Sequence, residues 1–346
     1  MKLEDIVSSA QYMNASYVFL SCNDSPKYKK DCSIEELNNT PLTKDECVSL
    51  AGQIIGEGPS DFEKTGVYET IKIINGIRCR VHISLRQGIP SFVILLIRGS
   101  ISALETMGLP DVVKGFASIR SGLILITGEP DSGKTSTIAS LVDYINRTKK
   151  KHVITFEKMI EYPIFSDHSQ IDQKQIGVDI PGYSEGFTSC LHENPDVIVF
   201  DELLTKETIE LAIRAAEAGC LVFSSSYISN TSEVTENMVQ LFSVEEQENI
   251  RMRLSLVLEA VILQKLIPQK KGGRILACEI MVVNEAIRAL IQQKRTSLIY
   301  NSIVASSREG GQLLDQELIR LCRSDLISRE TAISYAENKD IVIKRL

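Results

Sequence analysis

The sequence predicts a two-domain α/β protein, in which a small α+β domain precedes a larger domain built on a parallel sheet. The first reason is length, because 346 residues are more than one ordinary domain needs. The second is a change of pattern near residue 110, from short mixed elements to strands and helices that alternate regularly. The composition, with 43% hydrophobic and 24% charged residues, is that of a folded globular protein.

The small domain is predicted at residues 1–99. Helical patterns cover Asp5–Asn14 and Lys44–Gly56, and Thr43 is the predicted N-cap of the second helix. Strand patterns, separated by turn residues, cover Tyr17–Ser21, Thr70–Ile74, Arg78–Leu85 and Phe92–Arg98. Residues 100–110 read as a linker to the second domain.

The larger domain is predicted at residues 111–346. Its elements alternate in the order Leu123–Thr127 (strand), Lys134–Arg147 (helix), His152–Phe156 (strand), Glu185–Leu191 (helix), Val197–Phe200 (strand), Lys206–Ala218 (helix) and Leu221–Ser224 (strand). This alternation predicts a parallel sheet covered by helices on both faces. From about residue 244 the pattern is mostly helical, with helices expected at Glu245–Leu263, Glu285–Gln292, Gln312–Ser324 and Arg329–Ala336, the last capped by Ser328.

Composition excludes several classes of function. The net charge of -7 and the pI of about 5.4 disfavour general nucleic-acid binding, which needs clustered basic residues. The N-terminal residues MKLEDIVSSAQY contain acids where a signal peptide needs an apolar core, and the longest apolar run, Phe92–Ile97, is too short to span a membrane. Eight cysteines form no CxxC pair, and His82, His152 and His168 have no partners at metal-ligand spacing. We therefore expect a cytoplasmic protein without membrane insertion.

Residues Gly128–Thr135 match the P-loop pattern G-x-x-x-x-G-K-[ST], and they lie between a predicted strand and a predicted helix. In such a loop the backbone N–H groups and the helix N-terminus face phosphates. Lys134 is expected to reach the β- and γ-phosphates of ATP, and the Thr135 hydroxyl to bind Mg²⁺. The predicted nucleotide contacts are Gly128, Asp131, Ser132, Gly133, Lys134, Thr135 and Ser136.

Two acidic segments follow the P-loop at strand ends. The apolar strand before Asp201 and Glu202 has the form of a Walker B strand, in which Asp201 holds Mg²⁺ through water and Glu202 polarises the attacking water. In the segment Thr155–Tyr162, Glu157 and Glu161 follow another strand. From the residues alone, Glu157 and Glu161 are either site residues at the carboxyl edge of the sheet or solvent-exposed acids.

The order of these segments resembles the PilT-type secretion ATPases, which retract type IV pili. The segments are the P-loop, TFEKMIEY, NPDVIVFDE, ETIELAIRAAEAGCLVF and AIRALI, and the resemblance covers nearly the whole chain. It implies a PAS-like N-terminal domain, a RecA-like ATPase domain and a homo-hexameric ring with nucleotide between the two domains. It also implies an inner-membrane pilus platform protein as partner, and a location in the cytoplasm at the inner face of the cell membrane.

The resemblance also implies roles for individual residues. Lys134 and Thr135 take the P-loop roles, and Glu202 takes the role of the Walker B carboxylate. Glu161 takes the role of the functional acid in the family's aspartate box, and Arg80 is an arginine that the N-terminal domain presents to the nucleotide.

Several positions depart from the family's pattern. Lys158-Met159 stand where the family has Asp-Pro, and Cys220 and Tyr227 stand where it has histidines. We expect Cys220 and Tyr227 to be packing or polar-surface residues and not catalytic replacements. Arginines of the family are absent at His192, Leu204, Gly88 and Leu95.

Asp131 replaces a glycine of the family inside the P-loop. A like charge about 6 Å from a phosphate costs about 2–3 kcal/mol at an effective dielectric constant near 20, unless the side chain points to solvent. Two hypotheses therefore remain open. The chain is either an active motor ATPase, or a nucleotide-binding paralogue that hydrolyses ATP weakly and regulates or assists a fully active motor, for example within a mixed ring.

Overall fold

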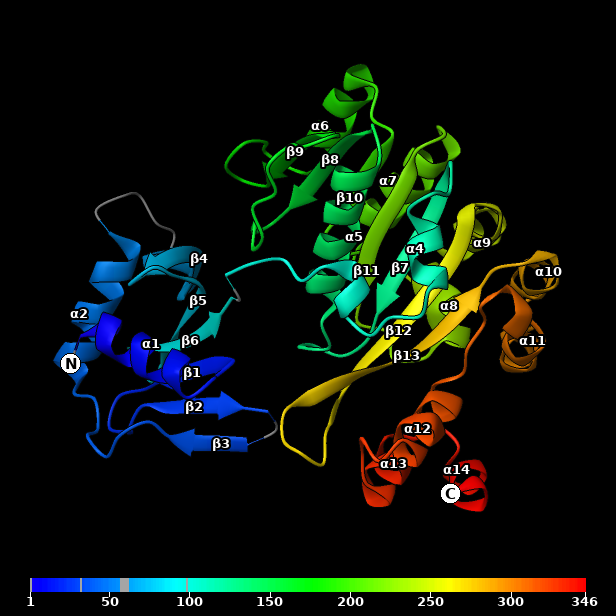
Figure 1. Ribbon diagram of the computed structural model, residues 1–346. Helices are drawn as coiled ribbons and strands as arrows, with labels where there is room; N and C mark the ends of the chain where they lie inside the picture. Colours follow the sequence, from blue (N-terminus) through cyan, green and yellow to red (C-terminus); the bar gives the residue numbers. More distant parts are fainter. Residues whose placement is uncertain (1, 32, 57–61, 98) are drawn as a thin grey trace. The chain divides into compact units, whose positions relative to one another are not determined.

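The computed structural model describes residues 2–31, 33–56, 62–97 and 99–346 (Figure 1). By their internal contacts these residues form two compact units, each with its own β-sheet. One unit comprises Met1–Ser100 with the short segment Met159–Tyr162, and the other comprises Ile101–Lys158 with Pro163–Leu346. Arg98, the last residue of a predicted strand, lies outside the described residues. Within the described ranges, no helix is long and apolar enough to cross a bilayer.

The first unit is an antiparallel sheet with the strand order β3-β2-β1-β6-β5-β4. Its strands are β1 (Tyr17–Leu20), β2 (Lys27–Lys30), β3 (Ser33–Glu36), β4 (Val67–Ile74), β5 (Ile77–Arg86) and β6 (Ile89–Leu96). Its helices are α1 (Leu3–Tyr12), α2 (Lys44–Ile55) and α3 (Phe62–Thr65). The predicted helices and strands are all present, and Thr43 caps α2 by accepting a hydrogen bond from the Glu46 amide.

Strands β2 and β3 were not predicted from the sequence. Their residues, KYKK and SIEE, are mostly charged, and every residue of β3 is exposed. Charged side chains are common at sheet edges because they discourage pairing with other chains. An edge strand of this kind lacks the alternating apolar pattern on which the prediction depended.

The second unit has a seven-stranded sheet with the order β13-β12-β7-β11-β10-β8-β9. The strands are β7 (Gly122–Thr127), β8 (His152–Glu157), β9 (Gln170–Gln175), β10 (Val197–Phe200), β11 (Leu221–Ser226), β12 (Leu258–Pro268) and β13 (Arg274–Val282). Neighbouring strands run parallel except β12 and β13, which are antiparallel. The predicted α/β class is therefore confirmed, with a mixed sheet in place of a purely parallel one.

The helices of this unit cover the sheet, and the last of them form the C-terminal part of the chain. They are α4 (Val112–Phe116), α5 (Lys134–Thr148), α6 (Tyr183–Cys190), α7 (Lys206–Glu217), α8 (Val234–Val239), α9 (Val244–Val257), α10 (Glu285–Gln292), α11 (Ile299–Ala305), α12 (Leu314–Arg323), α13 (Arg329–Tyr335) and α14 (Lys339–Arg345). Helices α12, α13 and α14 form a separate small core with residues of β12 and β13.

The predicted helix Glu245–Leu263 is wrong in its second half. Helix α9 ends at Val257, and Leu258 begins β12 without an intervening loop. Strand β12 pairs with β7 on one side and β13 on the other, so its apolar run is that of a central strand buried on both faces. Apolar periodicity does not separate such a strand from a buried helix. Strand β9 was also missed, because its sequence QIDQKQ is mostly polar.

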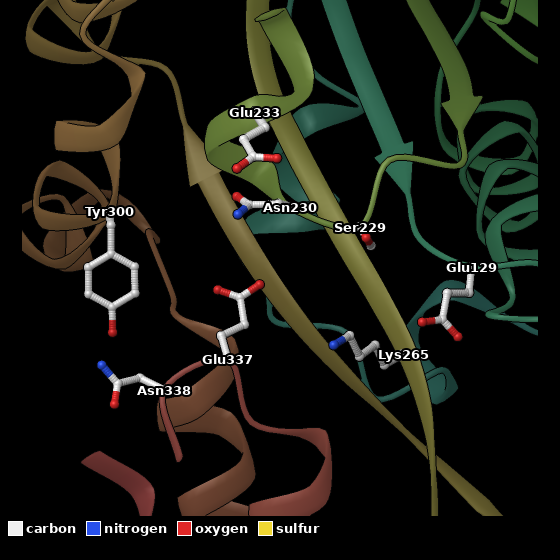
Figure 2. Close-up of a pocket in the computed structure, with 8 residues that line it drawn as sticks. All are labelled: Glu129, Ser229, Asn230, Glu233, Lys265, Tyr300, Glu337 and Asn338. Carbon is white, nitrogen blue, oxygen red and sulfur yellow. The ribbon is translucent and has the colours of Figure 1, made fainter. Parts of the chain in front are cut away.

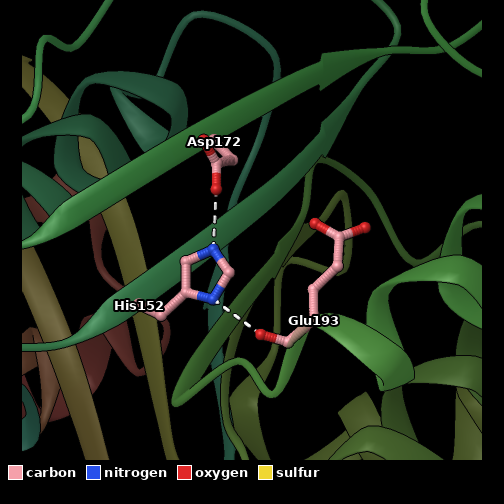
Figure 3. Close-up of side chains that lie close together, drawn as sticks. All are labelled: His152, Asp172 and Glu193. Atoms are coloured by element: carbon pink, nitrogen blue, oxygen red, sulfur yellow. Dashed lines mark hydrogen bonds and ion pairs between the residues drawn. The ribbon is translucent and has the colours of Figure 1, made fainter.

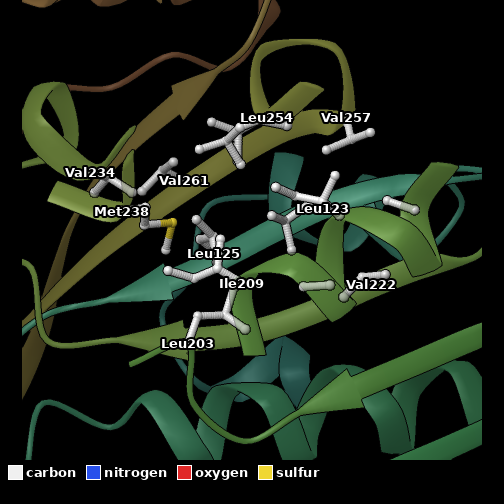
Figure 4. Close-up of a cluster of buried hydrophobic side chains, with 14 of the residues drawn as sticks. Leu123, Leu125, Leu203, Ile209, Val222, Val234, Met238, Leu254, Val257 and Val261 are labelled. Carbon is white, nitrogen blue, oxygen red and sulfur yellow. The ribbon is translucent and has the colours of Figure 1, made fainter. Parts of the chain in front are cut away.

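Two apolar cores lie on opposite faces of the sheet. Leu123 and Leu125 of β7 belong to one core, whereas Ile124 and Ile126 belong to the other, as the alternation of side chains along a strand requires. Figure 4 shows the first core, in which residues of the sheet meet Ile209 of α7 and Leu254 of α9. Helix α5 packs on the opposite core. This burial fixes β7 and α5, and therefore the ends of the loop between them.

Candidate nucleotide-binding site

The P-loop leaves the carboxyl end of β7 and enters α5 (Lys134–Thr148). Gly128 has φ +139°, and a Cβ atom there would lie 2.4 Å from the backbone oxygen of Gln264 on β12. Gly133, at the N-cap of α5, has the left-handed φ of +92°. Only glycine fits the close approach at Gly128, and Gly133 avoids the cost of a left-handed side-chain residue. The two glycines of the motif therefore have identifiable backbone roles.

Lys134 is enclosed by its own loop. Its Nζ donates hydrogen bonds to the backbone oxygens of Gly128 and Glu129, both at 2.8 Å. The same nitrogen lies 4.5 Å from the centre of the Tyr227 ring, within range of a cation–π interaction. Burial lowers the pKa of Lys134 to about 8, although the negative charges of Glu202, Asp131 and Glu129 partly oppose that shift.

The loop offers groups that suit a phosphate. The Ser132 hydroxyl is buried and, within the described ranges, has no hydrogen-bond partner in the protein. A buried hydroxyl without a partner is costly, so it fits a site that receives a polar ligand. Thr135 lies in the first turn of α5 and is exposed, and the helix N-terminus adds partial positive charge. Together with Lys134, these groups can hold the phosphates of a nucleotide.

Asp131 does not point to solvent, and its charge is paired. Its Oδ2 lies 2.9 Å from Nη1 of Arg274, the first residue of β13, and both side chains are mostly buried. The Asp131 backbone has φ +65°, an uncommon conformation for a residue with a side chain. The repulsion of phosphates expected from the sequence is therefore largely compensated by an arginine that is distant along the chain.

Asp201, which follows β10, is hydrogen-bonded to the segment after β8 and to α6. Its Oδ1 accepts hydrogen bonds from the Tyr183 hydroxyl at 2.5 Å and from the Glu202 amide at 2.9 Å. Its Oδ2 accepts one from the Lys158 amide at 2.8 Å. Burial raises the pKa of Asp201, and the donors from Lys158 and Tyr183 oppose that shift. A carboxylate has about four lone-pair positions, so one remains for a water molecule.

Glu202 lies beside residues that the sequence did not assign to the site. Its Oε1 accepts a hydrogen bond from the Tyr227 hydroxyl, and its Oε2 lies 3.7 Å from Nζ of Lys158. Tyr227 is exposed, as expected of a surface residue, and its hydroxyl makes a contact with Glu202 that the sequence did not predict. Cys220, by contrast, is buried, and its thiol donates to the Pro195 carbonyl at 3.4 Å, as expected of a packing residue.

Arg80 and Glu161 lie together in the first unit. Nη1 of Arg80 is 3.0 Å from Oε1 of Glu161, and its Nε is 2.7 Å from Oε1 of Glu69. Burial alone would lower the pKa of Arg80, but the hydrogen bonds and charges of Glu69 and Glu161 outweigh it and raise the pKa. Glu161 is buried and is therefore not a solvent-exposed acid. The structure thus groups the predicted site residues into this pair and the P-loop cluster of the second unit.

A pocket of about 650 Å³ lies beside the P-loop cluster (Figure 2). Glu129 of the P-loop and Ser229 and Asn230 of the segment after β11 contribute to its lining. Its other lining residues are Glu233, Lys265, Tyr300, Glu337 and Asn338. Three glutamates against one lysine make the pocket acidic, so it is a poor place for phosphate.

His152, Asp172 and Glu193 lie close together, within reach of a common metal ion (Figure 3). The His152 ring is already used in protein contacts, because Nε2 lies 2.7 Å from Asp172 Oδ2 and Nδ1 lies 3.0 Å from the Glu193 carbonyl oxygen. The Glu193 carboxylate pairs with Lys174 at 2.5 Å. These contacts join β8, β9 and the 3-10 turn Leu191–Glu193 that follows α6, so they give His152 a structural role.

Comparison with known proteins places these features in a family context. Residues 111–272 match the family described as type II/IV secretion system protein. The chain is 33% identical to the type IV pilus retraction ATPase PilT of Pseudomonas aeruginosa over 97% of this chain and 98% of that protein. It is 34% identical to a twitching motility protein of Neisseria gonorrhoeae over 72% of this chain and 67% of that protein. A crystal structure of the pilus retraction motor PilT with bound ADP matches with a TM-score of 0.84 and 31% identity over 99% of both chains.

Proposed function

This chain belongs to the PilT-type ATPases of the type II/IV secretion system family, and we propose that it is a subunit of a hexameric ring motor that uses ATP to drive retraction of type IV pili. As a member of this family it is an ATPase. The observation that carries the proposal is that Glu202 lies beside a complete P-loop, since the Tyr227 ring lies 4.5 Å from Nζ of Lys134 and the Tyr227 hydroxyl donates to Glu202. Retraction is the activity named for the relative that matches nearly the whole chain.

Phosphate binding rests on the loop and on Lys134. The Lys134 ammonium exchanges its two carbonyl contacts for phosphate oxygens, and the Ser132 hydroxyl gains a partner. The remaining phosphate contacts come from backbone N–H groups of Gly128–Thr135 and from the start of α5, with Ser136 beside them. Since phosphoryl transfer involves little covalent chemistry by the protein, this positioning and charge supply most of the catalysis.

Glu202 is assigned as the residue that polarises the attacking water, because a carboxylate at a strand end beside the P-loop can accept a hydrogen bond from that water. Thr135 and Asp201 are assigned to Mg²⁺, Thr135 through its exposed hydroxyl and Asp201 through water at its remaining lone pair. The ion, when bound, neutralises negative charge on the phosphates. Arg80 and Glu161 are assigned as a further pair of site residues, which an ion pair joins within the first unit.

The alternative of a weakly hydrolysing paralogue is not favoured. It depended partly on the charge of Asp131, which Arg274 compensates. It depended also on the arginine and histidine positions that differ from the family. Among these, Tyr227 stands at a histidine position and donates to Glu202, and Lys158 brings a positive charge to the same carboxylate. The proposed partner is a pilus platform protein of the inner membrane, and the proposed location is the cytoplasmic face of that membrane, both inferred from the family.

The test is steady-state phosphate release by the purified full-length chain, combined with its mass in solution. We expect Mg²⁺-dependent ATP turnover that Lys134→Ala and Glu202→Gln each reduce at least about 100-fold, and assembly into a hexamer. Tight ATP binding without turnover by the wild-type chain, with turnover only after addition of a PilT-type partner, would favour the paralogue instead. Restoration of twitching in a strain that lacks its retraction ATPase tests the biological output.

A further inference from the structure

Tyr227 follows directly after β11 (Leu221–Ser226), which pairs with β7 on the P-loop side of the sheet. The last pair in the register joins Ser226 to Thr127, the residue before Gly128. Tyr227 therefore leaves the sheet next to the start of the P-loop. Its position is fixed by a strand whose residues are all buried, so the side chain starts from a rigid base.

The two parts of the Tyr227 side chain contact two different groups of the site. The ring lies against Lys134 with its centre 4.5 Å from Nζ, and the hydroxyl donates a hydrogen bond to Oε1 of Glu202. Tyr227 therefore contacts both the lysine proposed to bind the phosphates and the carboxylate proposed to polarise the attacking water. Tyr227 is 43% exposed, so its side chain is accessible to solvent and to a ligand.

Lys158 contacts the other oxygen of the same carboxylate. Its Nζ lies 3.7 Å from Oε2 of Glu202, and its backbone N–H donates to Asp201 Oδ2 at 2.8 Å. The second contact fixes the chain at the point where Lys158 follows β8. Glu202 thus has a hydrogen-bond donor at Oε1, from the β11 side of β10, and an ion-pair partner near Oε2, from the β8 side.

We propose that Tyr227 and Lys158 are positioning residues for Glu202, each holding one carboxylate oxygen so that the group is oriented toward the attacking water. This inference rests on the proposed function, because it requires Glu202 to act on that water. A glutamate side chain has three rotatable bonds, and a displacement of about 1 Å from the reactive geometry can reduce the rate about 100-fold. The Tyr227 hydrogen bond fixes the direction of Oε1, and the Lys158 ammonium attracts Oε2 by its charge.

The experiment uses two substitutions, one that removes only the Tyr227 hydroxyl and one that removes only the Lys158 ammonium. Tyr227→Phe removes the hydrogen bond to Glu202 and keeps the aromatic face against Lys134. Lys158→Gln removes the charge and leaves the backbone bond to Asp201 in place. We expect Tyr227→Phe to lower kcat about 10- to 100-fold and Lys158→Gln about 2- to 10-fold, because its ammonium is more exposed and more distant. The KM for ATP should stay within about twofold of wild type, since neither change removes a phosphate contact.

Two control substitutions and one double variant test whether the loss of turnover depends on Glu202. The first control, Tyr144→Phe, removes a tyrosine hydroxyl from α5. The second, Lys206→Gln, removes the ion pair between Lys206 and Glu246, and Lys206 is about as exposed as Lys158. Neither control should change kcat. In a Glu202→Ala background, adding Tyr227→Phe should leave the residual turnover unchanged, because the group that it positions is gone. A general structural effect would instead lower turnover further in that background.

The outcomes distinguish this inference from the proposed function. If the wild-type chain turns over ATP but Tyr227→Phe has wild-type kcat, the positioning role is wrong and the ATPase assignment stands. The same conclusion follows if Tyr227→Phe raises KM and leaves kcat unchanged, or if its loss persists in the Glu202→Ala background. If the wild-type chain alone has no turnover, the proposed function itself fails. Thermal unfolding of each variant, expected within about 2 °C of wild type, excludes misfolding as the cause.

Discussion

Asp131 and Arg274 form an ion pair with 2.9 Å between Oδ2 and Nη1, and this pair ties the P-loop to the first residue of β13. Both side chains are about one-fifth exposed, so the pair is screened less than a surface pair. Asp131 lies in the P-loop, so under the proposed function its charge acts on the phosphates of the nucleotide. Arg274 then compensates an acidic residue in an anion-binding loop.

Removal of this compensation should weaken nucleotide binding. We expect Arg274→Gln to raise the Kd for ATP about tenfold, since an unpaired carboxylate about 6 Å from a phosphate costs about 2–3 kcal/mol before screening. The double variant Arg274→Gln with Asp131→Asn should bind with nearly wild-type affinity. Titration with a fluorescent ATP analogue measures the effect. An Arg274→Gln variant with unchanged affinity would show that the Asp131 charge is not felt by the nucleotide.

We expect the protein to take up protons when it binds nucleotide above pH 7.5. The pKa of Lys134 is about 8 in the free protein, so about half of the molecules carry a neutral lysine at pH 8. Bound phosphates favour the ammonium form and raise that pKa, so binding is coupled to protonation. Affinity should therefore fall as pH rises from 8 to 9.5, by at most tenfold per pH unit. Calorimetry in buffers of different ionisation enthalpy measures the uptake, and an absence of uptake at pH 8.5 contradicts the assignment.

Gly128 should be the glycine of the second unit that least tolerates a side chain. In Gly128→Ala the new methyl group meets the Gln264 carbonyl oxygen at 2.4 Å, in a backbone conformation with φ +139°. We expect a loss of about 2–4 kcal/mol in the free energy of unfolding, from overpacking and backbone strain together. Gly219→Ala is the matched control, because Gly219 has φ +99° with nothing within 4 Å of the new methyl group. Its loss should be about 1–2 kcal/mol, and equal losses in denaturant unfolding would contradict the close approach.

The hydrogen bond from Tyr183 to Asp201 should stabilise the second unit in a pH-dependent way. Tyr183→Phe removes a donor from a buried carboxylate, which should cost about 1–3 kcal/mol at pH 7. Burial raises the pKa of Asp201 in the folded state, so its charged form is the less favoured one and depends on its donors. The difference between variant and wild type should therefore shrink as pH falls through the folded pKa of Asp201. Unfolding measured at pH 4 and pH 7 tests this, and an equal loss at both values would contradict it.

The features that could be predicted are those formed by residues that are close together in the sequence. The P-loop could be recognised because its glycines, lysine and threonine are neighbours in sequence, and because buried strands are short runs of apolar residues. Strand β12 was missed because an apolar run after a helix does not show where the helix ends. Arg274 and Tyr227 could not be assigned to the site, since Arg274 is 143 residues from Asp131 and the Tyr227 contacts depend on the pairing of β11 with β7.

The antiparallel pair β12 and β13 has a mechanical consequence. At one end of β13, Arg274 forms an ion pair with Asp131 of the P-loop. In the turn just before it, the Lys270 amide donates to the Leu326 carbonyl at 3.0 Å, in the connection between α12 and α13. Ile267 and Ala277 of the same two strands belong to the core of the C-terminal helices. The two-stranded arm therefore connects the C-terminal helices, Leu314–Arg345, to the P-loop through a continuous set of packing, hydrogen-bond and ionic contacts. A load on those helices has a short structural route to the loop.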